Sequence, residues 1–288
     1  MNSTAFDLSI IILNYNNTEL TIKSVLTALD AAKKAALDAE ILLIDNSAPK
    51  TARTLRQAFI SEPRVSIIEN EVNQGFAKAN NQGIIFSKGR FLLILNNDVF
   101  LNAKCLLLGV NYLQDHPEVA IWAPQLVGLN GRLQASATDF PTLIDLVKEY
   151  LLFGRSRKNG IGQAIHPQVV DSVVGAFWLM PNWVVTKIGL LDESYFFTSE
   201  DVDYCKRIKE AGFKVVYDPR CSVVHIGGAS HVDKDWLSDP YLHKYRIIYF
   251  RKHHGILASW AAALIIRTGL WLRRMKLGYE KATNIRSS

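Results

Sequence analysis

Four short apolar segments dominate the first hundred residues, and a segment with helical spacing lies between each neighbouring pair. The apolar segments have the length and composition of strands that are buried on both faces. They cover residues 8–14, 40–45, 65–70 and 91–95. The helical segments cover residues 18–36, 51–59 and 76–89. Strands and helices that alternate at this distance need right-handed crossovers, so the sequence predicts an α/β fold with a parallel sheet flanked by helices.

The remainder of the chain is less regular. A helix is expected over 101–115, and the turn LNG between residues 119–127 and 132–137 predicts a β-hairpin. Residues 140–168 are expected to be irregular, and a strand-like segment follows over 171–180. A helix is expected in the second half of 191–213, and strands are expected at 214–218 and 222–226.

Composition narrows the classes of protein to which the chain can belong. Its 288 residues suffice for one large domain or two small ones, and the net charge of +6 suits phosphorylated ligands, a nucleic acid or an anionic membrane. Cys105, Cys205 and Cys221 form no CxxC pair, which indicates neither a zinc site nor a disulfide scaffold. The first residues lack a basic region and a long apolar run, so no signal peptide is predicted and the protein is expected to be cytoplasmic.

The last fifty residues differ in character from the rest. Residues 239–255 mix aromatic and basic side chains, and 255–281 read as an apolar helix that carries Arg267, Arg273, Arg274 and Lys276. The apolar run is at the lower limit for a membrane span. Because Arg267 lies inside the run, a helix lying on an anionic surface is favoured over a span. Packing on the domain, or on a second copy of the chain in a homo-oligomer, is the open alternative.

Each of the four predicted strands ends in amides and carboxylates. The run Asn14-Tyr15-Asn16 follows the first, Asp45-Asn46-Ser47 the second, Asn70 and Asn73 the third, and Asn96-Asn97-Asp98 the fourth. Each polar tip alone is typical of a turn. Together they predict one polar crevice, because ligands bind beyond the carboxyl ends of parallel strands. The chain has neither GxGxxG nor GxxxxGK[ST], so a divalent cation on Asp98 is the expected way to balance a bound diphosphate.

Two further segments contain side chains that can transfer a proton or bind a cation. Glu200, Asp201 and Asp203 lie within four residues, where the helix dipole explains at least one acid and an ion pair with Arg207 explains another. A carboxylate held there at the mouth of the crevice would suit a general base. His225 ends a strand before two glycines; it would serve either as a cation ligand or as an ordinary buried or surface residue.

In combination these stretches resemble glycosyltransferase family 2, the GT-A fold enzymes, and within it the bacterial rhamnosyltransferase-like branch. The matching stretches are SIIILNYNN, LLIDNS, NEVNQGFAKANNQGI, GRFLLILNNDV, VVGAFWLM, IGLLDESYFFTSEDVDYCKRIKEAGFKVVYDP and VVHIGGAS. They cover roughly residues 8–230 in the order of the family. The resemblance implies a GT-A, Rossmann-like, mixed and mainly parallel sheet flanked by helices, with a C-terminal helical extension.

The resemblance also implies roles for individual residues. The donor-binding set would be Asn14, Asn16, Asp45, Asn73, Gly75, Asn80 and Asn97. Asp98 and His225 would hold a divalent metal, Mg²⁺ or Mn²⁺, and Asp201 would be the catalytic base. Gly175, Trp178 and Glu200 would lie in the loop set between donor and acceptor. The chain departs from the family pattern at Asn96, in place of the first acid of DxD, and at Met180-Pro181, where relatives often carry arginine.

The implied activity is inverting transfer of a sugar from a nucleoside diphosphate sugar to a hydroxyl. The branch favours dTDP-rhamnose, with UDP-sugars next, and a lipid-linked saccharide acceptor at the inner membrane face; no nucleic acid is expected. The expected domains are a catalytic domain over 1–234, with a nucleotide-binding half 1–100 and an acceptor half 101–234, and a basic tail over 235–288. A metal-dependent phosphohydrolase and a non-catalytic nucleotide-binding protein are the rival classes.

Overall fold

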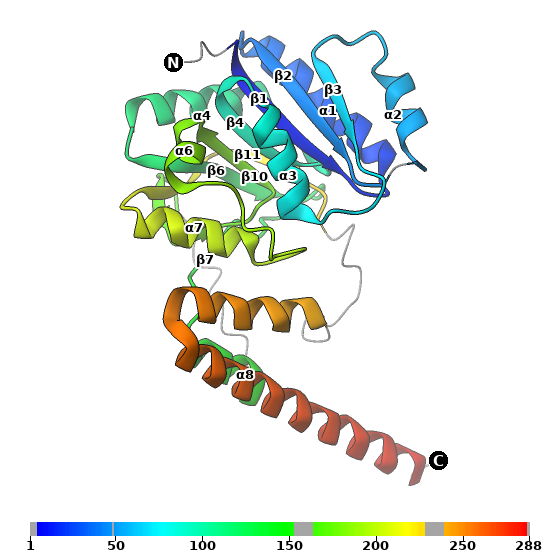
Figure 1. The fold of residues 1–288 in the computed structure, drawn as a ribbon, viewed down its shortest axis with the longest axis vertical. Coiled ribbons are helices and arrows are strands. Elements are labelled where there is room, and N and C mark those ends of the chain that lie inside the picture. Colours follow the sequence, from blue (N-terminus) through cyan, green and yellow to red (C-terminus); the bar gives the residue numbers. More distant parts are fainter. Residues whose placement is uncertain (1–4, 48, 153–163, 228–238, 287–288) are drawn as a thin grey trace. The chain divides into compact units, whose positions relative to one another are not determined.

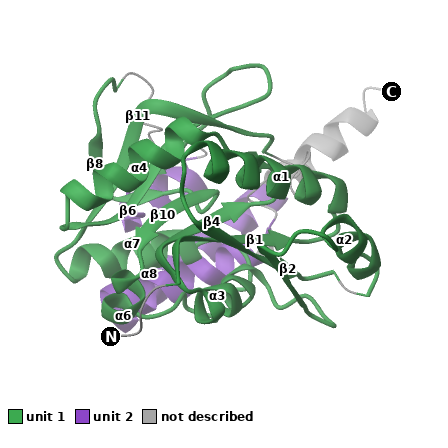
Figure 2. Cartoon of the chain, turned by 90° about the horizontal axis from the view of Figure 1, so that it is seen from above, with its two compact units in different colours: residues 1–138, 159–233 green, residues 139–158, 234–288 purple. Residues whose placement is uncertain are grey.

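The computed structural model describes residues 5–47, 49–152, 164–227 and 239–286. The chain divides into two compact units, which Figure 2 colours separately. Unit 1 comprises residues 1–138 and 159–233, and unit 2 comprises residues 139–158 and 234–288. The segment 139–158, from the middle of the chain, therefore groups with the C-terminal tail.

Unit 1 is built on a mixed, mainly parallel sheet with the strand order β3-β2-β1-β4-β10-β6-β11-β5, and β8 pairs with β11. The neighbours β3, β2, β1 and β4 are parallel, as are β6 and β11, while β10 runs antiparallel between β4 and β6. The strands are β1 (Phe6–Asn14), β2 (Ala39–Asp45), β3 (Val65–Glu69), β4 (Gly89–Asn96), β5 (Val99–Phe100), β6 (Val119–Val127), β8 (Gln168–Val170), β10 (Phe177–Pro181) and β11 (Lys214–His225). The predicted fold class is confirmed.

Helices cover both faces of this sheet (Figure 1). Leu8, Ile10 and Ile12 of β1 pack in one apolar cluster with side chains of α1 (Thr18–Lys34), α2 (Ala52–Ala58) and α4 (Ala103–Asp115). Ile11 points to the opposite face, where it lies against Gly83 of α3 (Phe76–Phe86). Because β1 is apolar on both faces, it is buried in the centre of the unit. Unit 1 also contains α6 (Trp183–Ile188) and α7 (Glu200–Glu210).

The predicted hairpin after β6 forms only in part: the chain reverses at the predicted turn and a single antiparallel bridge joins Val127 to Leu133, without a second strand. The amide of Leu126 donates to the Ser136 hydroxyl at 2.9 Å, so a side chain takes the place of the ladder carbonyl. The chain then forms β7 (Ala137–Thr138), which pairs with β9 (Ser172–Val173) in a separate two-stranded sheet. The two strands predicted at 214–218 and 222–226 form one strand, β11, with a register shift between them.

Unit 2 consists of α5 (Leu143–Leu146), the π-helix η1 (Val147–Leu151) and the long helix α8 (Pro240–Arg286). Part of the segment expected to be irregular is therefore helical; residues 153–163 of it lie outside the described residues. Gly255 has φ 85° and ψ 178°, so α8 bends there into two helical halves. Its stretch Tyr241–Met275 is, by length and composition, the one described helix that is long and apolar enough to cross a membrane.

Candidate active site

Asp45, at the carboxyl end of β2, is the centre of the first polar cluster. It is fully buried and accepts hydrogen bonds from the Asn14 amide at 2.9 Å and from the Ser47 hydroxyl at 2.9 Å. The Thr51 hydroxyl donates to its other oxygen at 2.6 Å. A buried carboxylate with this many donors is held in one orientation. Its predicted contact with a nucleobase stays a prediction.

A chain of hydrogen bonds joins the tips of β1 and β4. The Thr21 hydroxyl donates to the Asn14 side-chain oxygen at 2.7 Å and accepts from the Asn97 amide at 2.9 Å. Asn16 has φ 53°, in the left-handed region, and its backbone N–H donates to the Ser47 hydroxyl at 3.1 Å. The structure therefore brings together Asn14, Asn16, Asp45 and Asn97, as the crevice hypothesis requires.

An amide network that the sequence did not reveal holds the segment before α3. The Asn46 side chain donates to Asn73 Oδ1 at 2.9 Å and to the Gly75 carbonyl at 3.2 Å. It accepts from the Asn70 amide at 3.0 Å. Asn46 is one of the polar residues expected at the tip of β2, but its type alone is typical of a turn and does not predict these particular contacts. The predicted donor residues Asn73 and Gly75 are positioned by this network.

Asn80 lies on the first turns of α3 and is almost fully buried. Its amide donates to the Phe76 carbonyl at 2.9 Å. Within the described part of the chain, its Oδ1 is buried without a hydrogen-bond partner. A buried polar atom of this kind lowers stability and is typical of functional positions.

Gly75 and Gly175 connect the first hundred residues of unit 1 to the acidic cluster. Gly75 has φ 80°, and a Cβ there would lie 2.4 Å from the Phe196 carbonyl oxygen, so only glycine fits. A Cβ on Gly175 would lie 3.8 Å from the Cβ of Asp201. The next residue, Ala176, accepts a hydrogen bond from the backbone of Asn96 at 3.0 Å. The predicted base therefore lies beside the end of β4, the strand that leads to Asp98.

Trp178, predicted to lie between donor and acceptor, is fully buried. Its indole donates to the Val173 carbonyl at 3.2 Å and its ring stacks on Tyr204 of α7, with 5.7 Å between ring centroids. Trp178 therefore packs against α7, the helix that carries Asp201.

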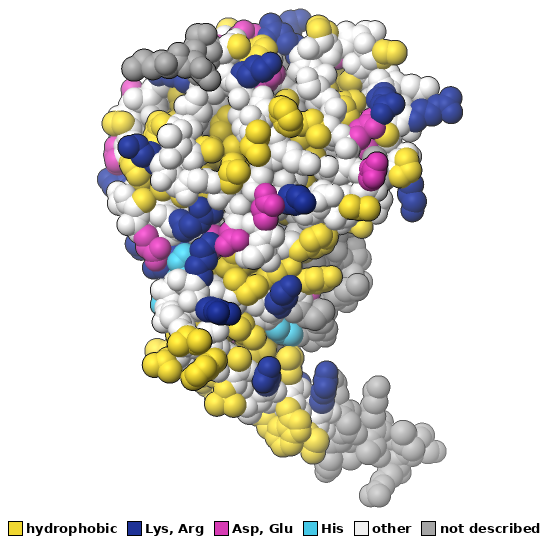
Figure 3. All heavy atoms as spheres, in the orientation of Figure 1, with side chains coloured by type: hydrophobic (Ala, Val, Ile, Leu, Met, Phe, Trp, Pro, Cys, Tyr) yellow, Lys and Arg dark blue, Asp and Glu magenta, His cyan; other side chains and the backbone are white. Residues whose placement is uncertain are grey.

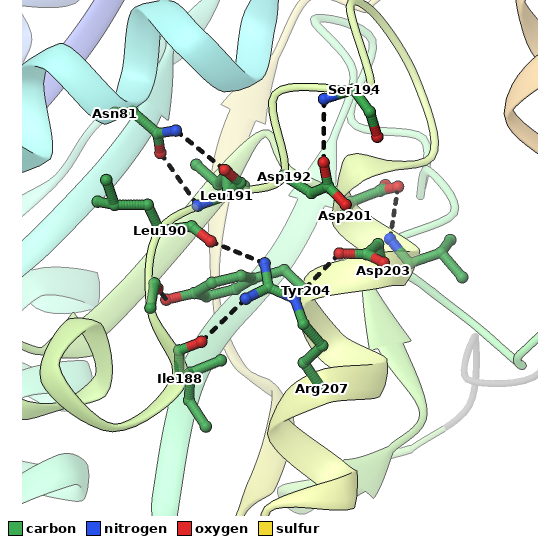
Figure 4. A network of polar contacts seen from close by, with 12 residues as sticks. Asn81, Ile188, Leu190, Leu191, Asp192, Ser194, Asp201, Asp203, Tyr204 and Arg207 are labelled. Carbon is green, nitrogen blue, oxygen red and sulfur yellow. Dashed lines mark hydrogen bonds and ion pairs between the residues drawn. The ribbon is translucent and has the colours of Figure 1, made fainter. Parts of the chain in front are cut away.

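The acidic cluster begins α7, and a network of polar contacts fixes it (Figure 4). Arg207 pairs with the buried Asp203 at 3.0 Å, as the i, i+4 spacing predicts, and also donates to the carbonyls of Ile188 and Leu190 at 2.9 and 2.8 Å. Asn81 of α3 donates to the Leu191 carbonyl at 2.9 Å and accepts from the Leu191 amide at 3.0 Å. This network connects α7 to α3 through the segment before the acids.

Backbone strain and burial distinguish the acids themselves. Thr198 and Ser199 both have positive φ, 71° and 72°, immediately before α7, and strain of this kind gathers at functional sites. Asp201 is partly exposed, and its Oδ1 accepts from the Val202 amide at 2.8 Å. Glu200 is buried, and burial, followed by the charge of Asp201, raises its pKa to about 8. The raised pKa favours the protonated form of Glu200, while Asp201 remains accessible.

A third cluster forms where β4 ends and β11 ends. Asp98 is buried; its Oδ1 lies 3.5 Å from Nε2 of His225, and its Oδ2 accepts from the Gly227 amide at 3.2 Å. On the other side of the imidazole, Nδ1 lies 2.6 Å from Oε1 of Gln134. The Gln134 amide nitrogen donates to the His225 backbone carbonyl at 2.8 Å. Gln134 follows β6 and belongs to no motif, so nothing in the sequence singles it out.

These contacts determine the tautomer of His225. A carbonyl only accepts, so the NH₂ of Gln134 must face it, and Oε1 must face Nδ1. Nδ1 therefore carries a hydrogen, and in the neutral ring Nε2 presents a lone pair toward Asp98. At 3.5 Å the pair is too long for a good hydrogen bond. A divalent cation between the two atoms would satisfy both, since its ligand bonds are each about 2.1 Å.

The cluster has the composition of a partial cation site. Among the described residues, no group of three or more His, Cys, Asp or Glu side chains lies close enough together to hold a metal ion by itself. Mg²⁺ and similar ions commonly take one or two protein ligands and complete their shell with substrate phosphates and water. Asp98 and His225 therefore fit an ion that is shared with a bound diphosphate.

Comparison with known proteins identifies the family to which the sequence is similar. The model of glycosyl transferase family 2 matches residues 9–178, more than half of the chain. The chain is 26% identical over 244 residues to the low-salt glycan biosynthesis hexosyltransferase Agl10 of Haloferax volcanii, covering 82% of this chain and 71% of that protein. It is 24% identical over 178 residues to the rhamnosyltransferase WbbL of Escherichia coli K12, covering 58% and 66% of the two chains.

Solved structures agree on the fold. The crystal structure of GalNAc-T7 with UDP, GalNAc and Mn²⁺ superposes with a TM-score of 0.62 at 16% identity, over 84% of this chain and 48% of that one. Residues 1–349 of S. aureus TarS superpose with a TM-score of 0.53 at 14% identity, over 85% and 65% of the two chains. These likenesses confirm the expected GT-A-like fold. Because the family model matches residues 9–178, more than half of the chain, the chain belongs to glycosyl transferase family 2.

Proposed function

We propose that the protein transfers a sugar from a nucleoside diphosphate sugar to an acceptor hydroxyl, with inversion at the anomeric carbon. One observation carries this proposal: Gly175 and Ala176 bring Asp201 next to the end of β4, the strand that leads to Asp98. A base for the acceptor and a carboxylate for the diphosphate thus lie at the same edge of the sheet. Membership of the family supports a nucleotide-sugar donor.

In the proposed reaction, Asp201 accepts the proton of the acceptor hydroxyl as that oxygen bonds to the anomeric carbon. The bond from that carbon to the diphosphate oxygen breaks on the opposite face, and the nucleoside diphosphate leaves with the electron pair. Asp98 and Nε2 of His225 would hold Mg²⁺ or Mn²⁺, which offsets the negative charge of the diphosphate. Gln134 holds the His225 ring with Nε2 toward Asp98.

The donor we favour is dTDP-rhamnose. The likeness to the rhamnosyltransferase WbbL supports this choice. A UDP-sugar is the second candidate, because the structural neighbour GalNAc-T7 was crystallised with UDP. Both donors present the same diphosphate to Asp98, so the choice between them leaves the mechanism unchanged.

The acceptor we favour is a lipid-linked saccharide in surface polysaccharide assembly, which would place the protein on the cytoplasmic face of the plasma membrane. The glycan biosynthesis named for Agl10 supports a saccharide acceptor. The basic and apolar side chains of the C-terminal helix support a location of the enzyme close to a lipid surface.

Calorimetry with dTDP, UDP, GDP and their sugars, each with Mg²⁺, Mn²⁺ or chelator, tests the donor and the metal together. We expect metal-dependent binding of dTDP-rhamnose, and we expect Asp98→Ala to remove the metal dependence. Product analysis separates the rival classes: a transferase without acceptor slowly releases intact nucleoside diphosphate, whereas a phosphohydrolase releases sugar phosphate or inorganic phosphate. Failure of the folded protein to bind any nucleotide would refute the proposal.

A further inference from the structure

Unit 2 displays an apolar stripe on the second half of α8, where hydrophobic side chains gather on the surface (Figure 3). After the bend at Gly255, the inner face of the helix buries Ser259, Ala262, Ile266 and Gly269. The opposite face carries the residues that we call the α8 stripe. They are between 59% and 73% exposed and comprise Leu257, Trp260, Leu264, Trp271 and Met275. A helix that is apolar on both faces needs a second apolar environment beyond its own unit.

The inner face of α8 is held firmly, so the helix cannot turn its stripe inward. Arg246 of the first half forms a buried ion pair with Glu149 of η1, with 2.6 Å between Nη1 and Oε2. The Ser259 hydroxyl donates to the Ile247 carbonyl at 3.3 Å across the bend. A Cβ on Gly269 would lie 2.5 Å from Cβ of Tyr150, so α8 packs closely on η1 there. The direction of the stripe is fixed by these contacts.

Charge around the stripe is of one sign. Residues 240–279 contain no Asp or Glu. Arg267 lies three residues after Leu264 and four before Trp271, so it shares their side of the helix, and Arg274 follows two turns later. Both arginines are exposed, as are Arg251 and Lys252 of the first half. The two exposed tryptophans are of a type that gathers at membrane–water interfaces.

We propose that the α8 stripe docks on an anionic lipid surface, with the helix lying in the plane of the interface. Its apolar side chains would enter the acyl boundary while Arg267 and Arg274 reach the lipid phosphates. A complete span would place Arg267 within the hydrocarbon, where charge is strongly disfavoured. A second copy packed through the same face would set arginines against arginines, with no acid in 240–279 to pair them.

This inference concerns unit 2 and goes beyond the proposed transfer reaction. It rests on the exposure and charge of α8. Lipid binding alone tests it, whichever sugar donor the protein uses. The full-length protein is therefore tested without nucleotide, with vesicles as the probe.

The experiment is flotation of the full-length protein with vesicles of phosphatidylcholine alone or mixed with phosphatidylglycerol. We expect flotation with the mixed vesicles, little with pure phosphatidylcholine, and release by high salt. The stripe variant Trp260→Gln/Leu264→Gln/Trp271→Gln should bind at least tenfold more weakly. Its control, Ile60→Gln/Leu129→Gln, removes two apolar side chains of unit 1 that are 84% and 72% exposed and should float like the parent.

A charge variant tests the lipid specificity. Arg267→Gln/Arg274→Gln should lower the affinity for mixed vesicles by roughly 30-fold. Each basic side chain near an anionic surface raises the affinity by roughly fivefold, and this variant removes two of them. Thermal unfolding of each variant should match the parent, because the altered side chains are exposed.

Three outcomes would overturn the proposal. One is equal flotation of the stripe variant and the parent. Another is that the parent does not bind vesicles and sediments as a stable dimer in their absence, whereas the stripe variant sediments as a monomer. The third is retention of bound protein on vesicles through an alkaline carbonate wash, which would mean that α8 crosses the bilayer.

Discussion

Nδ1 of His225 lies 2.6 Å from Oε1 of Gln134, while the Gln134 amide nitrogen donates to the backbone carbonyl of the same histidine at 2.8 Å. One side chain thereby fixes both the ring and its tautomer. Nε2 is left toward Asp98, the only acid of the NND run. In a site with a single carboxylate, the orientation of the one imidazole becomes decisive for cation binding.

Gln134→Leu should therefore weaken Mn²⁺ binding in the presence of a nucleoside diphosphate by roughly 10- to 100-fold, because the ring loses the partner that orients it. Electron paramagnetic resonance of free Mn²⁺ measures this affinity. Gln114→Leu, an exposed glutamine of α4, is the control and should bind as the parent does. Nitrogen-15 NMR of the metal-free protein should show hydrogen on Nδ1 of His225 in the parent. An unchanged tautomer and unchanged Mn²⁺ affinity in Gln134→Leu would refute the role.

Asp201→Asn should reduce sugar transfer by about 100-fold or more, since the amide cannot accept the acceptor proton. Nucleotide binding should stay within about twofold of the parent, because the predicted donor residues are on other elements. Transfer is measured with a saturating donor, and binding by calorimetry. Glu210→Gln, at the far end of the same helix α7, serves as the control for the loss of a carboxylate. Full activity in Asp201→Asn would remove this residue from the mechanism.

Glu200→Gln should make the free energy of unfolding fall less steeply as the pH rises. The pKa of Glu200 is raised from 4.5 to about 8 by burial and by Asp201, so the folded state binds a proton that the unfolded state releases between these values. Unfolding free energy therefore falls as pH rises through this window, by at most about 1.4 kcal/mol per pH unit. Glutamine is neutral throughout and lacks this contribution. Urea unfolding at several pH values between 5 and 8 gives both slopes, and identical slopes would contradict the assignment.

Arg207→Met should lower the unfolding free energy by about 3 kcal/mol, because it removes the cation that pairs with the buried carboxylate of Asp203. It also releases the carbonyls of Ile188 and Leu190. Lys206→Met, next to it on α7, breaks the partly exposed pair with Glu210 and should cost less than about 1 kcal/mol.

A second variant separates the buried charge from the lost packing. Asp203→Asn combined with Arg207→Met should recover part of the loss, since no unpaired charge remains buried. Chemical denaturation of the three variants measures these differences. A loss as small for Arg207→Met as for Lys206→Met would show that the network in Figure 4 does not support α7.

The pattern of strands predicted how the first four polar tips come together. Asn14 pairs in register with Asp45, and Leu13 with Asn96, because parallel strands of similar length end at the same edge of a sheet. The pair of Asp203 with Arg207 was predictable for a similar reason, since residues four apart share one side of a helix. Both relationships depend on local periodicity.

Contacts between distant segments had no such signal. Gln134 stands 91 residues from His225 along the chain, and Glu149 stands 97 residues from Arg246, yet each pair is in hydrogen-bond contact. Nothing in the neighbourhood of either residue in the sequence distinguishes it from an ordinary surface glutamine or glutamate. The hairpin after β6 stops at one bridge for a related reason: the Leu126 amide donates to the Ser136 hydroxyl, where a longer hairpin would supply a backbone carbonyl.

The sequence by itself thus determined the alternation of strands and helices, the polar strand tips and the acids at the start of α7, because apolar periodicity and residue type act over a few neighbouring positions. Only the tertiary structure decided that Glu200 is buried beside an accessible Asp201, that Gln134 orients His225, and that η1 fixes the direction of the α8 stripe. Those outcomes depend on which distant surfaces exclude water from one another, and burial of that kind is a property of the packed chain.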